Sequence, residues 1–364
     1  MDVRQVVAGK EHGGNTQYTN YRIPGMVITQ RNTLIMYYEA RMTADDWADM
    51  DILAFRSTGG GAHFSEPISL ASGSELGRTV NNPVMIAGHD GTLHFLYCVE
   101  YGVCLSCGSA ATAQCPHGVG VFYRRSTDDG ITWSEPVNIT DATAPEIRNV
   151  FAVGPGHGIC LPDGSLIATV WLVKKENSVD TIQSHHRACI STLYSKDNGN
   201  TWQLGEILPG IPGEDGREGD HNETMCAVTS DGGVMLTVRT GGVGYRALAW
   251  SKTGYSAWTP LRYESALPDA VCMGSAMAYN RSPHPYTILH ANCASPIKIR
   301  KNLMLKASTD NGKTWRLAKV IEADDAGYCD IAVDADGTIY VLYEVRAGQV
   351  CNLARLRYEE LETL

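Results

Sequence analysis

An eight-residue pattern repeats along this chain and constrains its fold more than any other feature. Copies of S-x-D-x-G-x-T-W begin at Ser126, Ser195 and Ser308, and two eroded copies begin at Ser57 and Ser251. Successive copies start roughly 55 to 70 residues apart, a spacing that indicates one supersecondary unit repeated along the chain. The repeat therefore predicts an architecture built from similar units.

Each copy has the chemistry of a tight turn between antiparallel strands. It follows an apolar run, its aspartate can bind the turn amides, its glycine can take a positive φ, and its tryptophan can pack under the next strand. No segment shows a sustained hydrophobic period near 3.6 residues, so the chain is predicted to be nearly all β. A second series of turn signals, each leading into an apolar strand, begins at Asn32, Gly91, Gly164, Gly232, Tyr286 and Gly337.

Six strand starts predict six four-stranded units. Units of this size fit a six-bladed β-propeller of four-stranded antiparallel blades, which leaves only short, protected sheet edges. A pair of β-sandwiches is the alternative, although sandwiches do not repeat a turn octapeptide. Because no linker divides the chain, we expect residues 1–364 to form one domain. The octapeptides should lie on its outer turns, and the functional site on the opposite rim.

The charge balance excludes some classes of partner. Thirty basic and 40 acidic residues give a net charge of −10, which repels nucleic acid and anionic membranes unless a local basic cluster overrides it. No stretch approaches the ~20 apolar residues of a membrane-spanning helix. The N-terminus lacks the apolar region of an export signal, and most of the 11 cysteines stand singly in apolar runs. A cytoplasmic location is favoured, and a secreted form whose signal has been removed is the alternative.

Charged side chains interrupt the apolar strands that we expect at the functional rim. Charged groups seldom lie at the ends of apolar strands without a partner or a ligand. These positions therefore indicate a charged site at one end of the propeller. They are Arg22, Glu39, Arg41, Glu223, Arg239 and Arg300.

Tyr21-Arg-Ile-Pro24, followed by the octapeptides, resembles the bacterial exo-α-sialidases (neuraminidases), a family with a Y/FRIP motif and Asp-box (BNR) repeats. The resemblance covers nearly the whole chain and extends to His221-Asn-Glu-Thr, Arg300-Lys-Asn-Leu and Gly327-Tyr328. It implies a six-bladed propeller and a glycoside hydrolase that needs no cofactor. The implied reaction is retaining hydrolysis of terminal sialic acids through a covalent tyrosyl intermediate, with a sialylated glycan or free sialoside as the partner.

The resemblance also implies a role for each charged position. Arg22, Arg239 and Arg300 look like the triad that grips the substrate carboxylate. Tyr328 is similar in placement to the family's nucleophile, and Glu223 to the base paired with it.

A second group of positions matches the rest of the family's site. Asp46 resembles the acid/base aspartate, and Asp45 and Asp49 are rivals in the same acidic run. Arg41 looks like the residue that contacts the 4-hydroxyl region of the sugar. Asn82 stands where relatives carry a residue facing the N-acyl or 4-hydroxyl region.

Two carboxylates and one further tyrosine are the remaining candidate site residues. Glu344, and with it Glu39, resembles the carboxylates that hold the first arginine in place. Tyr343 is less favoured than Tyr328 as the nucleophile, because it alternates along a strand whose neighbouring residue, Glu344, is already assigned to the pocket.

These residue types suit a substrate with a carboxylate on its anomeric carbon. Guanidinium groups are planar, always charged and able to form bidentate contacts. A tyrosine that stays neutral until Glu223 takes its proton avoids the charge repulsion that a carboxylate nucleophile would meet, and sialidases are exceptions to the two-carboxylate scheme. We expect the arginines to lower the pKa of Tyr328 from ~10. Asp46 would protonate the leaving oxygen and then activate water.

One segment is not typical of sialidases. Cys104, Cys107, Cys115 and His117 have a spacing that could close a structural Zn²⁺ site. A disulfide is an alternative, and simple reduced thiols are favoured over both. No other metal site is expected.

Two other functions stay open at this stage. The substrate could be a related 2-keto sugar acid such as KDN or Kdo, because the arginines would contact the carboxylate and not the C5 substituent. A non-hydrolytic carbohydrate-binding propeller is the other alternative, although a binder would not need Tyr328, Glu223 and Asp46 together. The residues do not predict linkage preference, transferase or anhydro-product activity, or oligomeric state.

Overall fold

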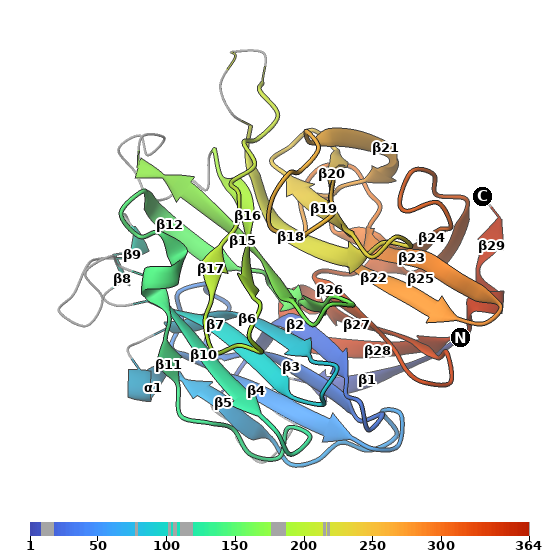
Figure 1. The fold of residues 1–364 in the computed structure, drawn as a ribbon. Coiled ribbons are helices and arrows are strands. Elements are labelled where there is room, and N and C mark those ends of the chain that lie inside the picture. Colours follow the sequence, from blue (N-terminus) through green and yellow to red (C-terminus); the bar gives the residue numbers. More distant parts are fainter. Residues whose placement is uncertain are drawn as a thin grey trace.

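Six antiparallel sheets lie around one central axis (Figure 1), so the predicted six-bladed β-propeller is confirmed. In this computed structural model, the strands of blades 1 to 5 follow each other from the axis outward in the order of the sequence. The structure describes residues 1–8, 18–76, 79–100, 103–104, 108–109, 119–175, 187–213, 216 and 219–363.

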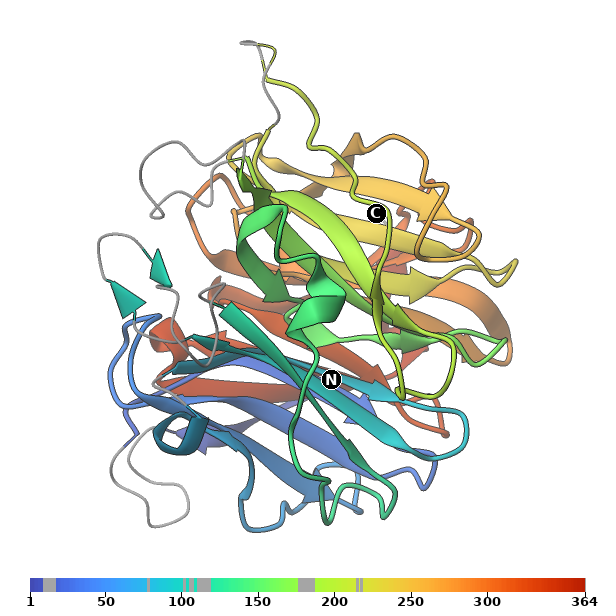
Figure 2. The ribbon, with the colours of Figure 1, turned by 60° about the vertical axis from the view of Figure 1, so that its left-hand side comes forward.

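Blades 1 and 2 are formed by the first part of the described chain. The strands of blade 1, from the axis outward, are β2 (Asn20–Ile28), β3 (Leu34–Arg41), β4 (Met50–Ser57) and β5 (Ile68–Ser72), followed by the short helix α1 (Gly73–Leu76). Those of blade 2 are β6 (Thr79–Ala87), β7 (Leu93–Glu100), β10 (Val119–Ser126) and β11 (Val137–Asn138). A small separate sheet outside the ring of blades (Figure 2) pairs β8 (Val103–Cys104) with β9 (Gly108–Ser109).

Blades 3 and 4 come next in the sequence, and each has four main antiparallel strands. The 3-10 helix η2 (Thr140–Thr143) leads into blade 3, and β13 (Gly156–His157) pairs in parallel with β6 at the axis. Blade 3 consists of β12 (Arg148–Val153), β15 (Leu166–Lys174), β16 (Cys189–Ser195) and β17 (Gln203–Leu204), with β14 (Ile159–Cys160) beside β15. Blade 4 consists of β18 (His221–Val228), β19 (Val234–Thr240), β20 (Tyr245–Ser251) and β21 (Arg262–Pro268).

The last two blades include both ends of the chain. Two 3-10 helices, η4 (Arg346–Gly348) and η5 (Tyr358–Glu360), flank the final long strand. Blade 5 consists of β22 (Ser275–Arg281), β23 (His284–Cys293), β24 (Lys301–Ser308) and β25 (Leu317–Asp325), with β29 (Glu362–Thr363) at its edge. Blade 6 consists of β26 (Cys329–Val333), β27 (Ile339–Val345), β28 (Val350–Leu356) and β1 (Asp2–Ala8).

The outer strand of blade 6 comes from the other end of the chain. β1 pairs with β28 in antiparallel register, with Asp2 opposite Arg355 and Ala8 opposite Val350. The amino group of Met1 forms an ion pair with Glu360. Residues from both ends of the sequence therefore share one sheet and close the ring.

Neighbouring blades bury the second strand of each sheet from both sides. Every residue of β3 and of β7 is buried. A strand that is covered on both faces has a continuous run of apolar residues in its sequence, whereas a strand with one exposed face alternates apolar and polar residues. This explains why charged residues in such strands, such as Glu39, stand out in the sequence.

The intact octapeptides form the turns between the third and fourth strands of blades 2, 3 and 5, and their predicted turn role is confirmed. In the first, the Asp128 carboxylate accepts hydrogen bonds from the amide and the hydroxyl of Thr132, at 2.9 and 2.6 Å. Gly130 takes a φ of 79°. Burial raises the pKa of Asp128, but the bonds from Thr132 outweigh it and lower the pKa to about 2. The same contacts recur at Asp197 and Asp310.

A buried carboxylate at the axis joins several blades. Asp330 of β26 has no exposed surface. Its Oδ2 accepts the amide of Met26 from β2 at 2.8 Å. Its Oδ1 lies 2.7 Å from His157 Nδ1 of β13 and accepts the hydroxyl of Ser275 from β22, also at 2.7 Å. One side chain therefore connects blades 1, 5 and 6 and β13, which lies between β12 and β15 of blade 3 in the sequence.

The structure also bears on membrane-spanning helices and on the state of the cysteines. Among the described residues, no helix is long and apolar enough to cross a membrane. The cysteines whose side chains the structure describes are free thiols, and most are buried.

Candidate active site

The charged strand ends gather on the rim away from the octapeptide turns. Glu223 lies near the start of β18 and Arg239 near the end of β19, which is the end of that hairpin opposite its connecting turn. A pocket of about 300 Å³ opens there. The residues predicted from the sequence that line it are Arg22, Arg41, Asp46, Asn82, Glu223, Arg239, Arg300 and Tyr328.

Tyr328, Glu223 and Arg239 form a contact set at the base of the pocket. The Tyr328 hydroxyl donates a hydrogen bond to Glu223 Oε1. Arg239 Nη1 donates to the Tyr328 oxygen at 2.9 Å and also pairs with Glu223 Oε2. Tyr328 is only 6% exposed. A nucleophile, a base and a cation therefore lie in direct contact, the arrangement that general-base activation of a hydroxyl requires.

The arginines lower the pKa of Tyr328 as expected, but the expectation that this pKa falls below its usual value is wrong. Burial raises this pKa most, the Glu223 carboxylate raises it further, and the lowering by Arg239 and Arg300 is smaller. The opposite holds for the base: burial raises the pKa of Glu223, but Arg239 and the bond from Tyr328 outweigh it, so that the net shift is downward. At neutral pH the tyrosine is protonated and the glutamate ionised.

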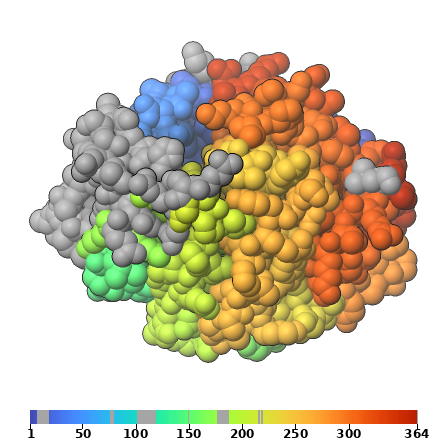
Figure 3. All heavy atoms as spheres, turned by 90° about the horizontal axis from the view of Figure 1, so that it is seen from above, coloured from blue at the N-terminus to red at the C-terminus, as the bar shows by residue number. Residues whose placement is uncertain are grey.

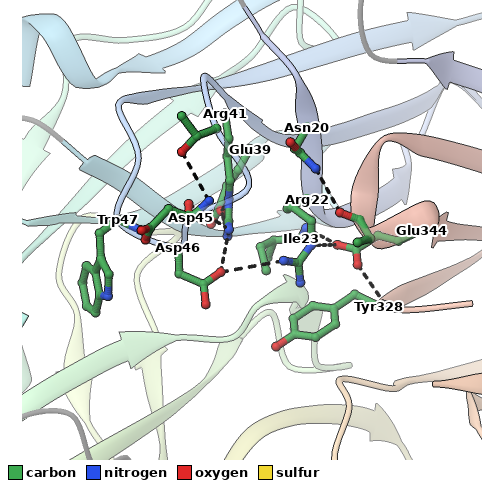
Figure 4. A network of polar contacts seen from close by, with 12 residues as sticks. Asn20, Arg22, Ile23, Glu39, Arg41, Asp45, Asp46, Trp47, Tyr328 and Glu344 are labelled. Atoms are coloured by element: carbon green, nitrogen blue, oxygen red, sulfur yellow. Dashed lines mark hydrogen bonds and ion pairs between the residues drawn. The ribbon is translucent and has the colours of Figure 1, made fainter. Parts of the chain in front are cut away.

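Arg22 is held in place by a carboxylate from blade 6. Its Nε donates to Glu344 Oε1 at 2.9 Å, and the amide of Ile23 donates to the same oxygen at 2.7 Å. Glu344 is 2% exposed. The pair, shown in Figure 4, raises the pKa of Arg22, chiefly through the charge of Glu344. The guanidinium carbon lies 5.3 Å from the centre of the Tyr328 ring.

Arg300 reaches the same ring from blade 5. Its guanidinium carbon lies 5.2 Å from the Tyr328 ring centre, and its Nη2 donates to the Val271 carbonyl at 3.3 Å. It forms no ion pair with any carboxylate in the part of the chain that the structure describes. Its charge is therefore available to an anion in the pocket.

Glu39 supports a different arginine from the one we expected. Its Oε2 accepts from Nε and Nη2 of Arg41, at 2.8 and 2.5 Å, and not from Arg22. Its Oε1 accepts the amide of Asn82 at 2.7 Å. The reason is register: Glu39 and Arg41 point to the same side of β3, where Arg41 is the nearest guanidinium. Glu39 thus positions Arg41 and Asn82, two residues of the pocket wall.

Asp46 lies at the mouth of the pocket. Its Oδ1 is 2.5 Å from Arg41 Nη1 and 3.7 Å from Arg22 Nη1, as Figure 4 shows, while its side chain is 72% exposed. Its rival Asp45 uses its carboxylate inside the turn, accepting the amide of Trp47 at 2.8 Å. Of the acidic run, Asp46 is the residue at the pocket and Asp49 does not line it. Tyr343, the less favoured nucleophile, is fully buried away from the pocket wall.

Several lining residues of blades 1 to 4 were not predicted from the sequence. The aromatic residues among them lie within apolar strands or next to the acidic run, where nothing in the local pattern separates a pocket residue from a core residue. Asn81 Nδ2 donates to Glu100 Oε1 at 3.1 Å. The main unpredicted lining residues are Trp47, Asn81, Glu100, Phe151, Trp171 and Asn222.

The proposed zinc ligands lie largely outside the described residues. Cys107, Cys115 and His117 are not among them, and for Cys104 the structure describes the backbone in β8 only. No cluster of three or more metal-ligating side chains occurs in the described part of the chain.

The fold and the site together define a six-bladed β-propeller with an arginine-lined pocket around a buried tyrosine and glutamate. Residues 70–341 match the family described as BNR repeat-like domain. The chain belongs to this family.

The comparisons also confirm the resemblance to bacterial sialidases. The chain is 26% identical over 356 residues to a sialidase of Bacteroides fragilis and 28% identical over 352 residues to a sialidase of Micromonospora viridifaciens. Each alignment covers 92% of this chain, but only 62% and 51% of those proteins, which are longer. The solved structure of Hadza microbial sialidase Hz136 is similar with a TM-score of 0.82 and 25% identity, over 97% of this chain and 69% of that one.

Proposed function

We propose that this chain is a retaining exo-α-sialidase, which releases terminal sialic acids from glycoconjugates. The observation that carries the proposal is the contact of the Tyr328 hydroxyl with Glu223 and Arg239, next to the guanidiniums of Arg22 and Arg300. The relatives named sialidases support the same activity.

The arginines would bind the substrate through its carboxylate. Arg300 has no competing carboxylate among the described residues, and Arg22 is fixed from behind by Glu344. Three guanidiniums at different angles can satisfy both oxygens of one carboxylate. This binding places the anomeric carbon, which carries the carboxylate, next to the Tyr328 oxygen.

The first chemical step would form a bond between Tyr328 and the anomeric carbon. Because the pKa of Tyr328 is raised and that of Glu223 is lowered, the proton stays on the tyrosine until attack begins. It would pass to Glu223 Oε1 along the existing hydrogen bond. The bond to the leaving oxygen breaks at the same time, and Asp46 would supply the proton for that oxygen.

The second step would reverse these roles. Asp46, now ionised, takes a proton from water, which attacks the anomeric carbon from the side that the leaving group occupied. The tyrosyl oxygen leaves and regains its proton from Glu223. Two displacements give net retention of configuration. No metal or redox cofactor takes part in this sequence of bond changes.

Release of 4-methylumbelliferone from its α-N-acetylneuraminide tests the proposal. We expect wild type to release it, and Tyr328→Phe to lose at least about 10³-fold in kcat, since a nucleophile and its base act as a unit. Tyr343→Phe is the matched control, because it removes one hydroxyl from another buried tyrosine that lies outside the pocket. It should keep wild-type activity.

The same assay separates hydrolysis from simple binding. A wild-type protein that binds sialosides but releases no product between about pH 4 and about pH 8 would be a carbohydrate-binding propeller. Equal activity of Tyr328→Phe and wild type would leave the hydrolase intact but remove the covalent tyrosyl mechanism. Isolation of a sugar linked to Tyr328 with a 3-fluorosialosyl fluoride would support it directly.

A further inference from the structure

A second hollow, of about 450 Å³, lies on the rim opposite the candidate active site. It is formed where blade 4 meets blade 5, whose adjoining surfaces appear in yellow and orange in Figure 3. Its walls come from the β18–β19 turn, the eroded octapeptide of blade 4 and the intact octapeptide of blade 5. Glu223 lies near one end of β18 and the hollow lies at the other end. At a rise of ~3.3 Å per residue, the two are about 20 Å apart.

The apolar wall of the hollow is the indole of Trp250. Its ring N–H donates to the Asn311 carbonyl at 2.8 Å, and its backbone amide donates to Thr259 Oγ1 at 3.0 Å. The guanidinium carbon of Arg262 lies 4.8 Å from the ring centre. The ring is therefore fixed in orientation while still lining open space, as aromatic residues in sugar and small-molecule sites do.

Three of the four charged side chains that line the hollow are cations. Lys252, Arg262 and Lys313 bring three positive charges to the wall. Asp231 pairs with Lys252, and Glu264 accepts from Arg262 at 3.1 Å. Lys313 forms no ion pair with a residue that the structure describes. Together with Asp231 and Glu264, these cations leave one net positive charge at the hollow in a chain whose net charge is −10, and this favours an anionic ligand.

We propose that this hollow is a second, non-catalytic binding site for a carboxylate-bearing sugar. The apolar face of a pyranose ring would lie against the face of Trp250 that Arg262 does not cover. The carboxylate would bind Lys313, and Lys252 in competition with Asp231. A bare phosphate would use the cations but not the indole, and a neutral sugar would use the indole but not the cations. The site is independent of the proposed hydrolysis, because no residue of it belongs to the pocket around Tyr328.

Titration of the full chain with methyl glucuronide tests the site, with methyl glucoside as the neutral probe of the same shape. The readout is the indole N–H resonance of Trp250 in ¹⁵N-labelled protein, identified by its absence in Trp250→Phe. We expect methyl glucuronide to shift this resonance with a Kd on the order of 1 mM, and methyl glucoside to bind at least about tenfold more weakly.

Matched lysine variants locate the carboxylate. Lys252→Ser and Lys313→Ser should each weaken methyl glucuronide binding about tenfold, because each removes one charge-assisted contact. Lys196→Ser is the control: Lys196 takes the place in the blade 3 octapeptide that Lys252 takes in blade 4, but it lies outside the hollow. Its removal should leave the Kd unchanged.

Four results would overturn the proposal. They are equal binding of the two glycosides, an unchanged Kd in both Lys252→Ser and Lys313→Ser, equal binding of inorganic phosphate, and shifts confined to the indoles of Trp47 and Trp171. The third would make the hollow a plain anion site, and the fourth would place the ligand in the pocket around Tyr328. Because Tyr328→Phe leaves the hollow intact, failure of the hydrolase proposal and failure of this one are distinguishable.

Discussion

Replacing Asp330 with alanine should destabilise the whole propeller. This carboxylate is buried at the axis and accepts bonds from the amide of Met26, the ring of His157 and the hydroxyl of Ser275. The three donors come from different parts of the propeller. The substitution therefore removes one acceptor that all three share. Since Asp330 does not line the pocket, the effect should appear in stability before it appears in substrate binding.

The size of the loss in the free energy of unfolding depends on how many of these donors are left without another acceptor. The Met26 amide and the His157 ring are fixed in position, whereas the Ser275 hydroxyl can rotate. Each buried donor left without a partner costs about 1 to 3 kcal/mol, so the two fixed ones give a loss of about 2 to 6 kcal/mol. For 364 residues the entropy of unfolding is about 0.8 kcal/mol per degree, so a loss of about 4 kcal/mol lowers the Tm by about 5 °C.

Differential scanning calorimetry at pH 7 and one fixed scan rate measures this change, because a chain of this size can unfold irreversibly. Asp330→Asn keeps one acceptor oxygen and should lower the Tm by less than Asp330→Ala. Asp141→Ala, at an exposed aspartate in η2, is the control and should change the Tm by less than about 1 °C. A fall of less than about 1 °C in Asp330→Ala would refute the reasoning.

Three further predictions concern the site and the turns. Asp46→Ala should lose about 10² to 10⁴-fold on a natural sialoside but much less on the aryl sialoside, whose leaving group needs little acid assistance; equal losses would exclude Asp46 as the acid. Glu344→Gln, which weakens the support of Arg22, should raise the KM for an aryl sialoside about tenfold, and an unchanged KM would contradict that role. The pKa of Asp128 is lowered to about 2, so its contribution to stability is complete above about pH 4 and lost as the pH falls through about 2. Asp128→Asn should therefore flatten the fall of Tm across that range, and a parallel fall would contradict it.

The sequence was sufficient to predict the fold because turn chemistry is local. The aspartate and glycine of the octapeptide act within a few residues of each other, as the contacts of Asp128 with Thr132 show. The second series of turn signals, which leads into one strand of each blade, then predicts the number of blades. The position of the site on the opposite rim follows from the same alternation of turns.

The sequence was not sufficient to predict properties of the site that depend on distances between residues of different blades. The pKa of Tyr328 depends on how deeply the ring is buried relative to its distance from Arg239 and Arg300, which no local pattern contains. The partner of Glu39 depends on which guanidinium lies closest after β3 packs between its neighbours. For the same reason Trp171, inside an apolar strand, could not be separated from a core residue.

The pairing of β1 with β28 has a consequence for how the chain folds. The four main strands of each of blades 1 to 5 are consecutive in the order of their sheet, so they can pair as soon as their own residues have been synthesised. Blade 6 instead joins Asp2 to Arg355, and closing so long a loop costs about 5 kcal/mol in chain entropy. Until β28 is made, β1 has no partner and exposes an unpaired strand edge. Ring closure should therefore be the last step of folding, and β1 the segment most exposed to aggregation before it occurs.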